Sequence, residues 1–178
     1  AAITERDSLP VMDTKGVTTL ISDSGITRYR VNTAEWLIYD RKKPPYWAFE
    51  KGVYMEQFDS IFNVEASIKA DTAYYYDKER LWKLIGNVDI QNRKGERFNT
   101  ELLYWNEATQ KVYSDKFIRI QQPDRIITGH GFDSNQQMTI YTIRNIEGIF
   151  YVDEEASSGP PQPETKALPD SVNKDAAK

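Results

Sequence analysis

The clearest pattern in the chain is a strict alternation of apolar and polar residues over positions 62–71. Residues with even numbers in this segment are apolar, and residues with odd numbers are polar. A two-residue period is typical of a β-strand with one buried and one solvated face. The same period recurs at residues 88–90 and 117–120, and only residues 33–38 leave a helix open. The pattern therefore predicts strands almost throughout.

Short polar segments separate these runs where β-hairpins require turns: residues 59–60, 77–80, 92–95, 106–109 and 122–124. Similar hairpin units open near residues 52, 86 and 116, which indicates strands stacked by repetition along one axis with open edges at both ends. Strands at this spacing favour an all-β fold, an open antiparallel β-jellyroll or two-sheet sandwich, over βαβ units.

The chain divides into one β-domain and two terminal segments. Residues 17–152 contain the alternating runs and are long enough to bury a core. Residues 153–178 are acidic and Pro-rich, so they cannot bury enough apolar surface, and we expect a disordered tail. Residues 1–16 form an N-terminal segment, and nowhere does the sequence approach the roughly 20 apolar residues that span a bilayer.

Composition argues against several kinds of chemistry. The chain has no Cys and a single His, His130, which excludes disulfides, thiol nucleophiles and His-rich metal centres. We expect no cofactor and no metal. His130 lies between two glycines, where a structural role is more common than catalysis, and no Gly-x-Ser-x-Gly motif accompanies it. The net charge is −4 without a basic stripe, so nucleic acid is not an expected partner.

Two other functions stay open at this point. The 27 acidic residues could supply the carboxylate pair of a glycosidase, although most lie on polar strand faces or in turns, where a solvated role is the simpler interpretation. Trp36, Tyr39, Tyr46 and Trp47 cluster around two prolines and could form a glycan platform, as in a carbohydrate-binding or adhesion module of the cell envelope. Aromatic packing in a sandwich core is the alternative explanation for this cluster.

Six sequence blocks follow one another in a fixed order: residues 70–75, 84–90, 95–104, 113–120, 128–134 and 141–150. They contain an apolar-Gly-x-Val-x-Ile run, then Gly-x-x-Phe-x-Thr, Leu-x-Tyr and Tyr-Ser. In this order the blocks resemble the lipopolysaccharide export family LptC and the broader OstA-like family, over residues 17–151. Residues 24–31 together with Trp36 are similar to the Bacteroidetes branch of that family.

The resemblance implies a non-enzymatic periplasmic carrier with an open β-jellyroll. In that family the cleft shelters lipid A acyl chains. Its N-terminal edge docks on the permeases of an inner-membrane ABC transporter, and its C-terminal edge passes lipopolysaccharide to an OstA-like bridge protein. Family members are tethered to the inner membrane by an N-terminal anchor, which the resemblance implies should precede residue 1.

The apolar strand faces supply candidates for the acyl groove: Val64, Ala66, Ile68, Val88, Ile90, Phe98, Leu102, Ile118, Ile120 and Ile126. Exposed strand edges invite pairing with other chains. Two such edges are expected here, Thr18, Thr19, Leu20 and Ile21 at one end and Thr139, Ile140, Tyr141 and Thr142 within residues 138–143 at the other. These edges could bind the transporter and the bridge protein, or pair two copies of the chain edge to edge.

Overall fold

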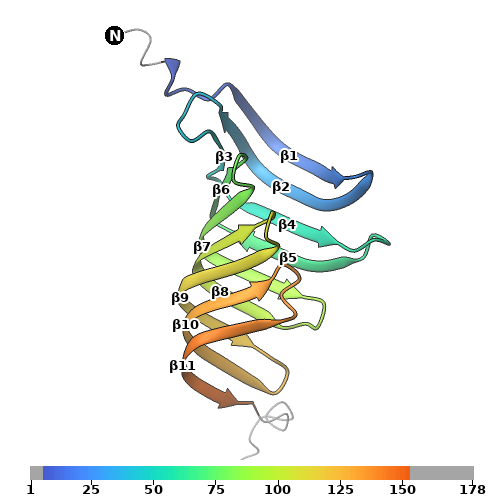
Figure 1. Cartoon of the computed structure of the whole chain (residues 1–178), viewed down its shortest axis with the longest axis vertical. Coiled ribbons are helices and arrows are strands. Elements are labelled where there is room, and N and C mark those ends of the chain that lie inside the picture. Colours follow the sequence, from blue (N-terminus) through green and yellow to red (C-terminus); the bar gives the residue numbers. More distant parts are fainter. Residues whose placement is uncertain (1–5, 153–178) are drawn as a thin grey trace, which may run out of the picture.

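The computed structural model describes residues 6–152 as one antiparallel sheet of eleven strands that is not a closed barrel. The predicted all-β fold is thereby confirmed. The strands are β1 (Met12–Asp23), β2 (Ile26–Tyr39), β3 (Tyr46–Phe49), β4 (Val53–Phe58), β5 (Val64–Ala70), β6 (Thr72–Tyr76), β7 (Leu81–Asn92), β8 (Arg97–Asn106), β9 (Lys111–Gln121), β10 (Arg125–Asn135) and β11 (Tyr141–Tyr151). They stack along the long axis of the molecule, with the β1–β2 hairpin at one end and β11 at the other (Figure 1).

The sheet divides into two layers because two of its strands each have different partners along their length. On β2, residues 29–33 pair with β4 and residues 37–39 pair with β3. On β7, residues 81–85 pair with β6 and residues 89–92 pair with β5. We call the side with β3 and β6 the first layer and the side with β4 and β5 the second layer. Strands β8 to β11 run through both.

Each long strand bends where it passes from one layer to the other. The ladders between β7, β8, β9, β10 and β11 all shift register near this point, as β-bulges do. Gly86 has φ +80° at the bulge of β7, and Gly131 has φ +80° at the bulge of β10, a conformation that side chains with a Cβ rarely adopt. The bulges therefore fold the sheet onto itself.

Contacts between aromatic rings show that the layers pack face to face. Phe98 is level with Ile127 across the ladders of the second layer, yet its ring lies 5.7 Å from Phe132 and 5.0 Å from Tyr141, which belong to the first layer. These contacts require the bend. Phe98 and Phe132 are fully buried, and burying a side chain of this size stabilises the fold by roughly 1.5–3 kcal/mol.

The predicted turns and residues 33–38, for which a helix was left open, all have a defined place in the structure. The five predicted turns coincide with the connections between strands, although Asn92 and Asn106 are still the last residues of β7 and β8. Residues 33–38 lie within β2, so the helical alternative for them is wrong. Strand β1 begins at Met12, so the predicted N-terminal segment 1–16 contributes its last residues to the sheet. The tail predicted for residues 153–178 lies outside the described part of the chain.

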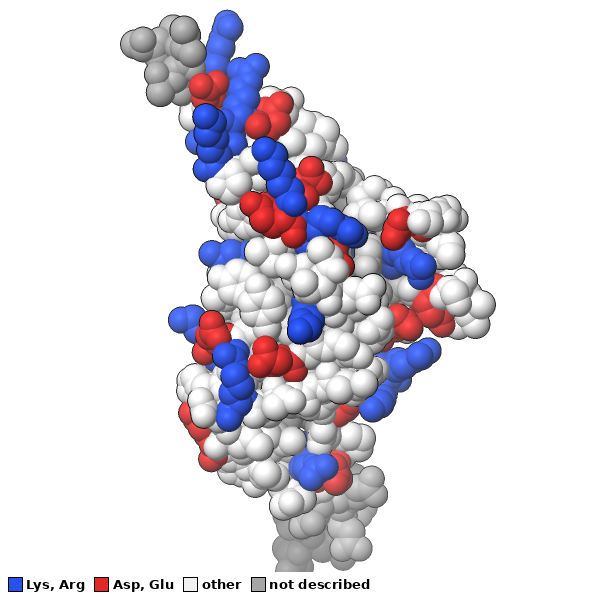
Figure 2. Space-filling view, in the orientation of Figure 1, with Lys and Arg blue, Asp and Glu red and all other residues white. Residues whose placement is uncertain are grey.

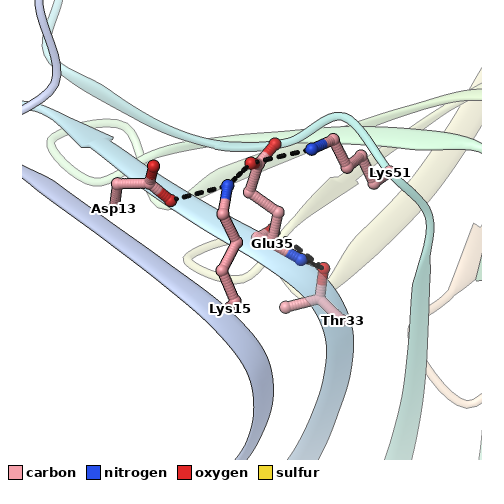
Figure 3. A network of polar contacts seen from close by, with 5 residues as sticks. All are labelled: Asp13, Lys15, Thr33, Glu35 and Lys51. Carbon is pink, nitrogen blue, oxygen red and sulfur yellow. Dashed lines mark hydrogen bonds and ion pairs between the residues drawn. The ribbon is translucent and has the colours of Figure 1, made fainter.

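A polar network fixes the end of the sheet that carries β1. Glu35 on β2 is 7% exposed, and its carboxylate accepts hydrogen bonds from Lys15 on β1 and from Lys51 at 3.0 Å (Figure 3). The single hydroxyl hydrogen of Thr33 is shared between the carbonyls of Gly52, at 2.8 Å, and Glu35, at 3.0 Å. The network joins β1 and the β3–β4 turn to β2, next to the place where β2 changes partners.

Candidate functional site

Hairpin turns of the two layers face each other across an opening, which we call the mouth of the fold. A cavity of about 560 Å³, which we call the vestibule, opens there between the β1–β2 hairpin, the β4–β5 turn and the first-layer turns. Arg28, Asp59, Arg80, Glu107 and Gln136 are among the residues that line it. The vestibule is therefore polar and carries charges of both signs.

Hydrogen bonds hold the vestibule walls in place. Glu107 accepts hydrogen bonds from the hydroxyl of Tyr75 at 3.2 Å and from the indole of Trp82 at 2.9 Å, and it pairs with Arg80 at 3.6 Å. On the opposite wall, the backbone N–H groups of Asn63 and Ile61 donate to the Asp59 carboxylate and hold its pKa below its usual value. These contacts hold the charged side chains of the vestibule in place.

The inner wall of the vestibule leads to the space between the layers. A cavity of about 10 Å³ adjoins it, lined by Met55, Glu56, Ala66, Ile68 and Trp105, and it shares Tyr29, Gln57 and Gln136 with the vestibule. That volume accommodates about one water molecule. Burial, followed by the charge of Glu107, raises the pKa of Tyr29 to about 12. The polar vestibule therefore opens onto an apolar interior that is almost completely packed.

The half of the mouth nearer β11 is closed by a set of hydrogen bonds that we call the clasp, formed by Asn92, Glu96, Gln122, Met138 and Tyr141. The amide of Asn92 donates to the Met138 carbonyl at 2.8 Å and to Glu96 at 2.9 Å. Glu96 also accepts hydrogen bonds from Gln122 at 3.0 Å and from the hydroxyl of Tyr141. Met138 is 1% exposed. The clasp thus joins the β10–β11 turn of the first layer to turns of the second layer.

A comparison with protein families agrees with this architecture. The family model described as lipopolysaccharide-assembly, LptC-related, matches residues 17–150, which is most of the 178-residue chain. The chain belongs to this LptC-related family. The predicted resemblance to LptC is thereby confirmed. A search of curated proteins found no match.

Membership of the LptC-related family implies a role in lipopolysaccharide assembly and transport. The family is a periplasmic transport component and is not catalytic. Within residues 6–152, no group of three or more His, Cys, Asp or Glu side chains is arranged to hold a metal ion. In the same residues, no helix is long and apolar enough to cross a bilayer.

Seven of the ten predicted groove residues lie between the layers. They are less than 9% exposed and belong to the second-layer half of the core: Ala66, Ile68, Val88, Ile90, Phe98, Ile118 and Ile120. The first-layer half of the same interior was not predicted from the sequence, and its large side chains include Trp82, Leu84, Leu103, Trp105, Val112 and Phe132. The sequence did carry a signal for these core residues. Trp82 and Leu84 are two residues apart, as are Leu103 and Trp105, which is the spacing of side chains on one face of a strand.

The other three predicted groove residues lie elsewhere. Leu102 follows Phe98 in phase, but the bulge in β8 shifts that phase and puts Leu103, with no exposed surface, into the core. Ile126 pairs with the exposed Gln121 and so lies on the outer face. Val64 is 48% exposed at the beginning of β5.

The two predicted partner edges lie at opposite ends of the sheet. Among the described residues, β1 pairs with β2 alone and β11 with β10 alone, so each has a free edge. Residues 18–21 are within β1. The C-terminal edge begins later than expected, because Thr139 and Ile140 lie in the turn and the strand starts at Tyr141 and Thr142.

The other chemical candidates lie away from the interior. A hollow of about 970 Å³ on the outer face includes Lys69, Asp89, Phe117 and the exposed His130, whose ring contacts Glu147. Charges of both signs are interspersed over the face seen in Figure 2. In the aromatic cluster, the Trp36 and Trp47 rings lie 5.0 Å apart and pack against the core. This arrangement favours aromatic packing over an exposed glycan platform.

Proposed function

We propose that this chain is a lipopolysaccharide carrier that holds lipid A acyl chains between its two layers and the polar headgroup at the vestibule. The observation that carries the proposal is the position of a polar cavity directly above an apolar interior. This arrangement suits an amphipathic ligand. A purely polar glycan would gain nothing from the interior, and a purely apolar ligand would gain nothing from the vestibule.

Loading requires the layers to separate, because their facing side chains are in contact. Each buried methylene contributes about 0.8 kcal/mol, so a dozen methylenes contribute roughly 10 kcal/mol before the cost of ordering the chain. An acyl chain between the layers would replace packing against the opposite layer by packing against lipid. The net gain is therefore smaller than this figure, which suits a carrier that must also release its cargo.

The free edges at opposite ends of the sheet suit a handover from one protein to the next. We assign β1 to the permeases of an inner-membrane ABC transporter and β11 to an OstA-like periplasmic bridge protein, both by added-strand pairing. Exposed Ile146, Phe150 and Tyr151 beside the β11 edge support this assignment. Edge-to-edge pairing of two copies would use the same surfaces.

The wider context of the proposal rests on the family. We infer that the chain works in the periplasm, held at the inner membrane by an N-terminal segment, and that it belongs to the Bacteroidetes branch that residues 24–31 resemble. Residues 17–152 act as the carrier domain between an N-terminal segment and a C-terminal tail.

Binding of lipopolysaccharide to the purified chain tests the proposal. Ile68→Asp puts a charge on the interior face, and Lys69→Asp puts the same charge on the exposed outer face of the same strand. Saturable binding that Ile68→Asp removes and Lys69→Asp retains, with circular dichroism unchanged, would support the interior site. Should Ile68→Asp not fold, Ile68→Ala provides the milder comparison. Absence of binding to the folded wild type, or equal binding by all variants, would refute the carrier.

A further inference from the structure

Among the described residues, two buried indole donors have no partner, those of Trp36 and Trp105, and of the two only Trp105 lines the small cavity. Trp105 is 4% exposed, and its indole Nε1 is buried without any hydrogen bond in the described structure. Leaving a buried donor unpaired costs about 1–3 kcal/mol. The neighbouring Trp82 shows the usual solution, because its Nε1 donates to Glu107 at 2.9 Å. An unpaired donor beside a satisfied one suggests that a ligand supplies the acceptor.

The position of Trp105 restricts what that ligand can be. The ring lines the small cavity together with Met55, Ala66 and Ile68, and Tyr29 packs against its edge at 5.0 Å. Met55, Ala66 and Ile68 make the inner side of the site apolar, so the part of the ligand that runs inward must be hydrocarbon. Glu56, Gln57 and Gln136 also line the cavity, so a polar group on the ligand can lie beside the indole. The vestibule lies immediately outside, across residues that the two cavities share. A charged or ester headgroup would remain in the vestibule, with its chain running inward past Trp105.

We propose that Trp105 Nε1 donates a hydrogen bond to a hydroxyl oxygen a few carbons along the acyl chain, so that this site selects 3-hydroxyacyl chains over unsubstituted ones. When the headgroup lies in the vestibule, a hydroxyl at that position of the chain reaches the unpaired indole N–H. An unsubstituted chain leaves this donor unpaired. The inference rests on the proposed function and adds a substrate preference to it. Trp105 is thus a specificity-determining residue of the interior.

Displacement of cis-parinaric acid from the full chain tests this preference, with tetradecanoic acid and 3-hydroxytetradecanoic acid as competitors. Wild type should prefer the hydroxylated acid by about threefold to tenfold, the range that one net hydrogen bond provides. Trp105→Phe keeps a ring in the core but removes the N–H, and its preference should fall to about one. Trp36→Phe is a matched control, because Trp36 Nε1 is also buried without a partner but Trp36 does not line the cavity.

The outcomes separate this inference from the carrier proposal. If the folded wild type binds neither acid nor lipopolysaccharide, the proposed function fails. If both acids bind equally well, or if Trp105→Phe retains the preference, the selection by Trp105 is refuted while the carrier stands. If Trp36→Phe also loses the preference for the hydroxylated acid, that preference does not arise at the Trp105 cavity.

Discussion

Glu96→Gln should weaken the clasp without changing the size of the side chain. Glu96 is 7% exposed, and one of its carboxylate oxygens accepts hydrogen bonds from both Gln122 and Tyr141. Hydrogen bonds to a charged group contribute about 1 kcal/mol more than neutral ones. In either orientation the amide of the variant puts an NH2 group opposite at least one donor, Asn92 on one oxygen or Gln122 and Tyr141 on the other, and the remaining bonds lose the charge, so we expect a loss of about 2 kcal/mol.

Hydrogen exchange of the backbone amides in residues 136–140 measures this loss locally. A clasp weakened by about 2 kcal/mol should open about thirty times more often, and these amides should exchange faster by that factor, while amides in the β7–β8 core keep their protection. Glu79→Gln in the exposed β6–β7 turn is the control and should change neither rate. Unchanged exchange in residues 136–140 of Glu96→Gln would refute the clasp as the contact that closes the mouth.

The clasp should also give way at low pH. Burial alone would raise the pKa of Glu96, but hydrogen bonds from Tyr141, Asn92 and Gln122 outweigh it and lower that pKa below the ordinary value. A carboxylate with a lowered pKa in the fold stabilises it fully above its unfolded-state pKa, near 4.5. That contribution is lost as the pH falls through the lowered value. The exchange difference between wild type and Glu96→Gln should therefore disappear in acid.

Further perturbations test the edges and the bend. Thr19→Pro on β1 should weaken binding to the transporter and Thr142→Pro on β11 binding to the bridge protein, each by at least about tenfold with the fold retained, and intact binding would refute strand addition. Gly129→Ala places a Cβ 2.3 Å from a backbone carbonyl oxygen on β11, so urea unfolding should show a loss of about 2 kcal/mol or more. That loss should exceed the loss for Gly25→Ala, where the Cβ meets open space and only the φ of +79° opposes the substitution. Glu35→Gln should speed exchange in the β1–β2 hairpin, mainly at low salt.

Alternation in the sequence was sufficient to predict the fold class and seven residues of the second-layer half of the core, but not Val31, Met55 and Phe58 in the same half. It predicted Ile68 and Ile90 correctly as interior residues, because both lie on stretches where the phase is constant. It failed at Leu102, because a β-bulge adds a residue to one strand only and leaves no clear mark in the sequence. The same interruption concealed that β8 contributes Phe98 to one layer and Trp105 to the other.

The vestibule and the clasp could not be predicted from the sequence at all. Asn92 and Met138 are 46 residues apart, and their hydrogen bond depends on how far the sheet folds back on itself. Turn composition predicts a turn but not which turn lies opposite. The polar residues involved therefore resembled ordinary solvated turn residues until the two layers were seen together.

The clasp, more than the apolar packing, should determine how readily the layers open. When an acyl chain enters, the chain can take the place of the apolar packing between Phe98 and Phe132, at a similar free energy per unit area. The hydrogen bonds of Asn92 and Glu96 have no such replacement, because a hydrocarbon chain neither donates nor accepts. Breaking these few hydrogen bonds at the mouth thus costs free energy on loading, whereas exchanging the apolar packing of the interior for lipid costs almost none. Weakening the clasp should therefore increase the extent of lipid binding as well as speed its uptake.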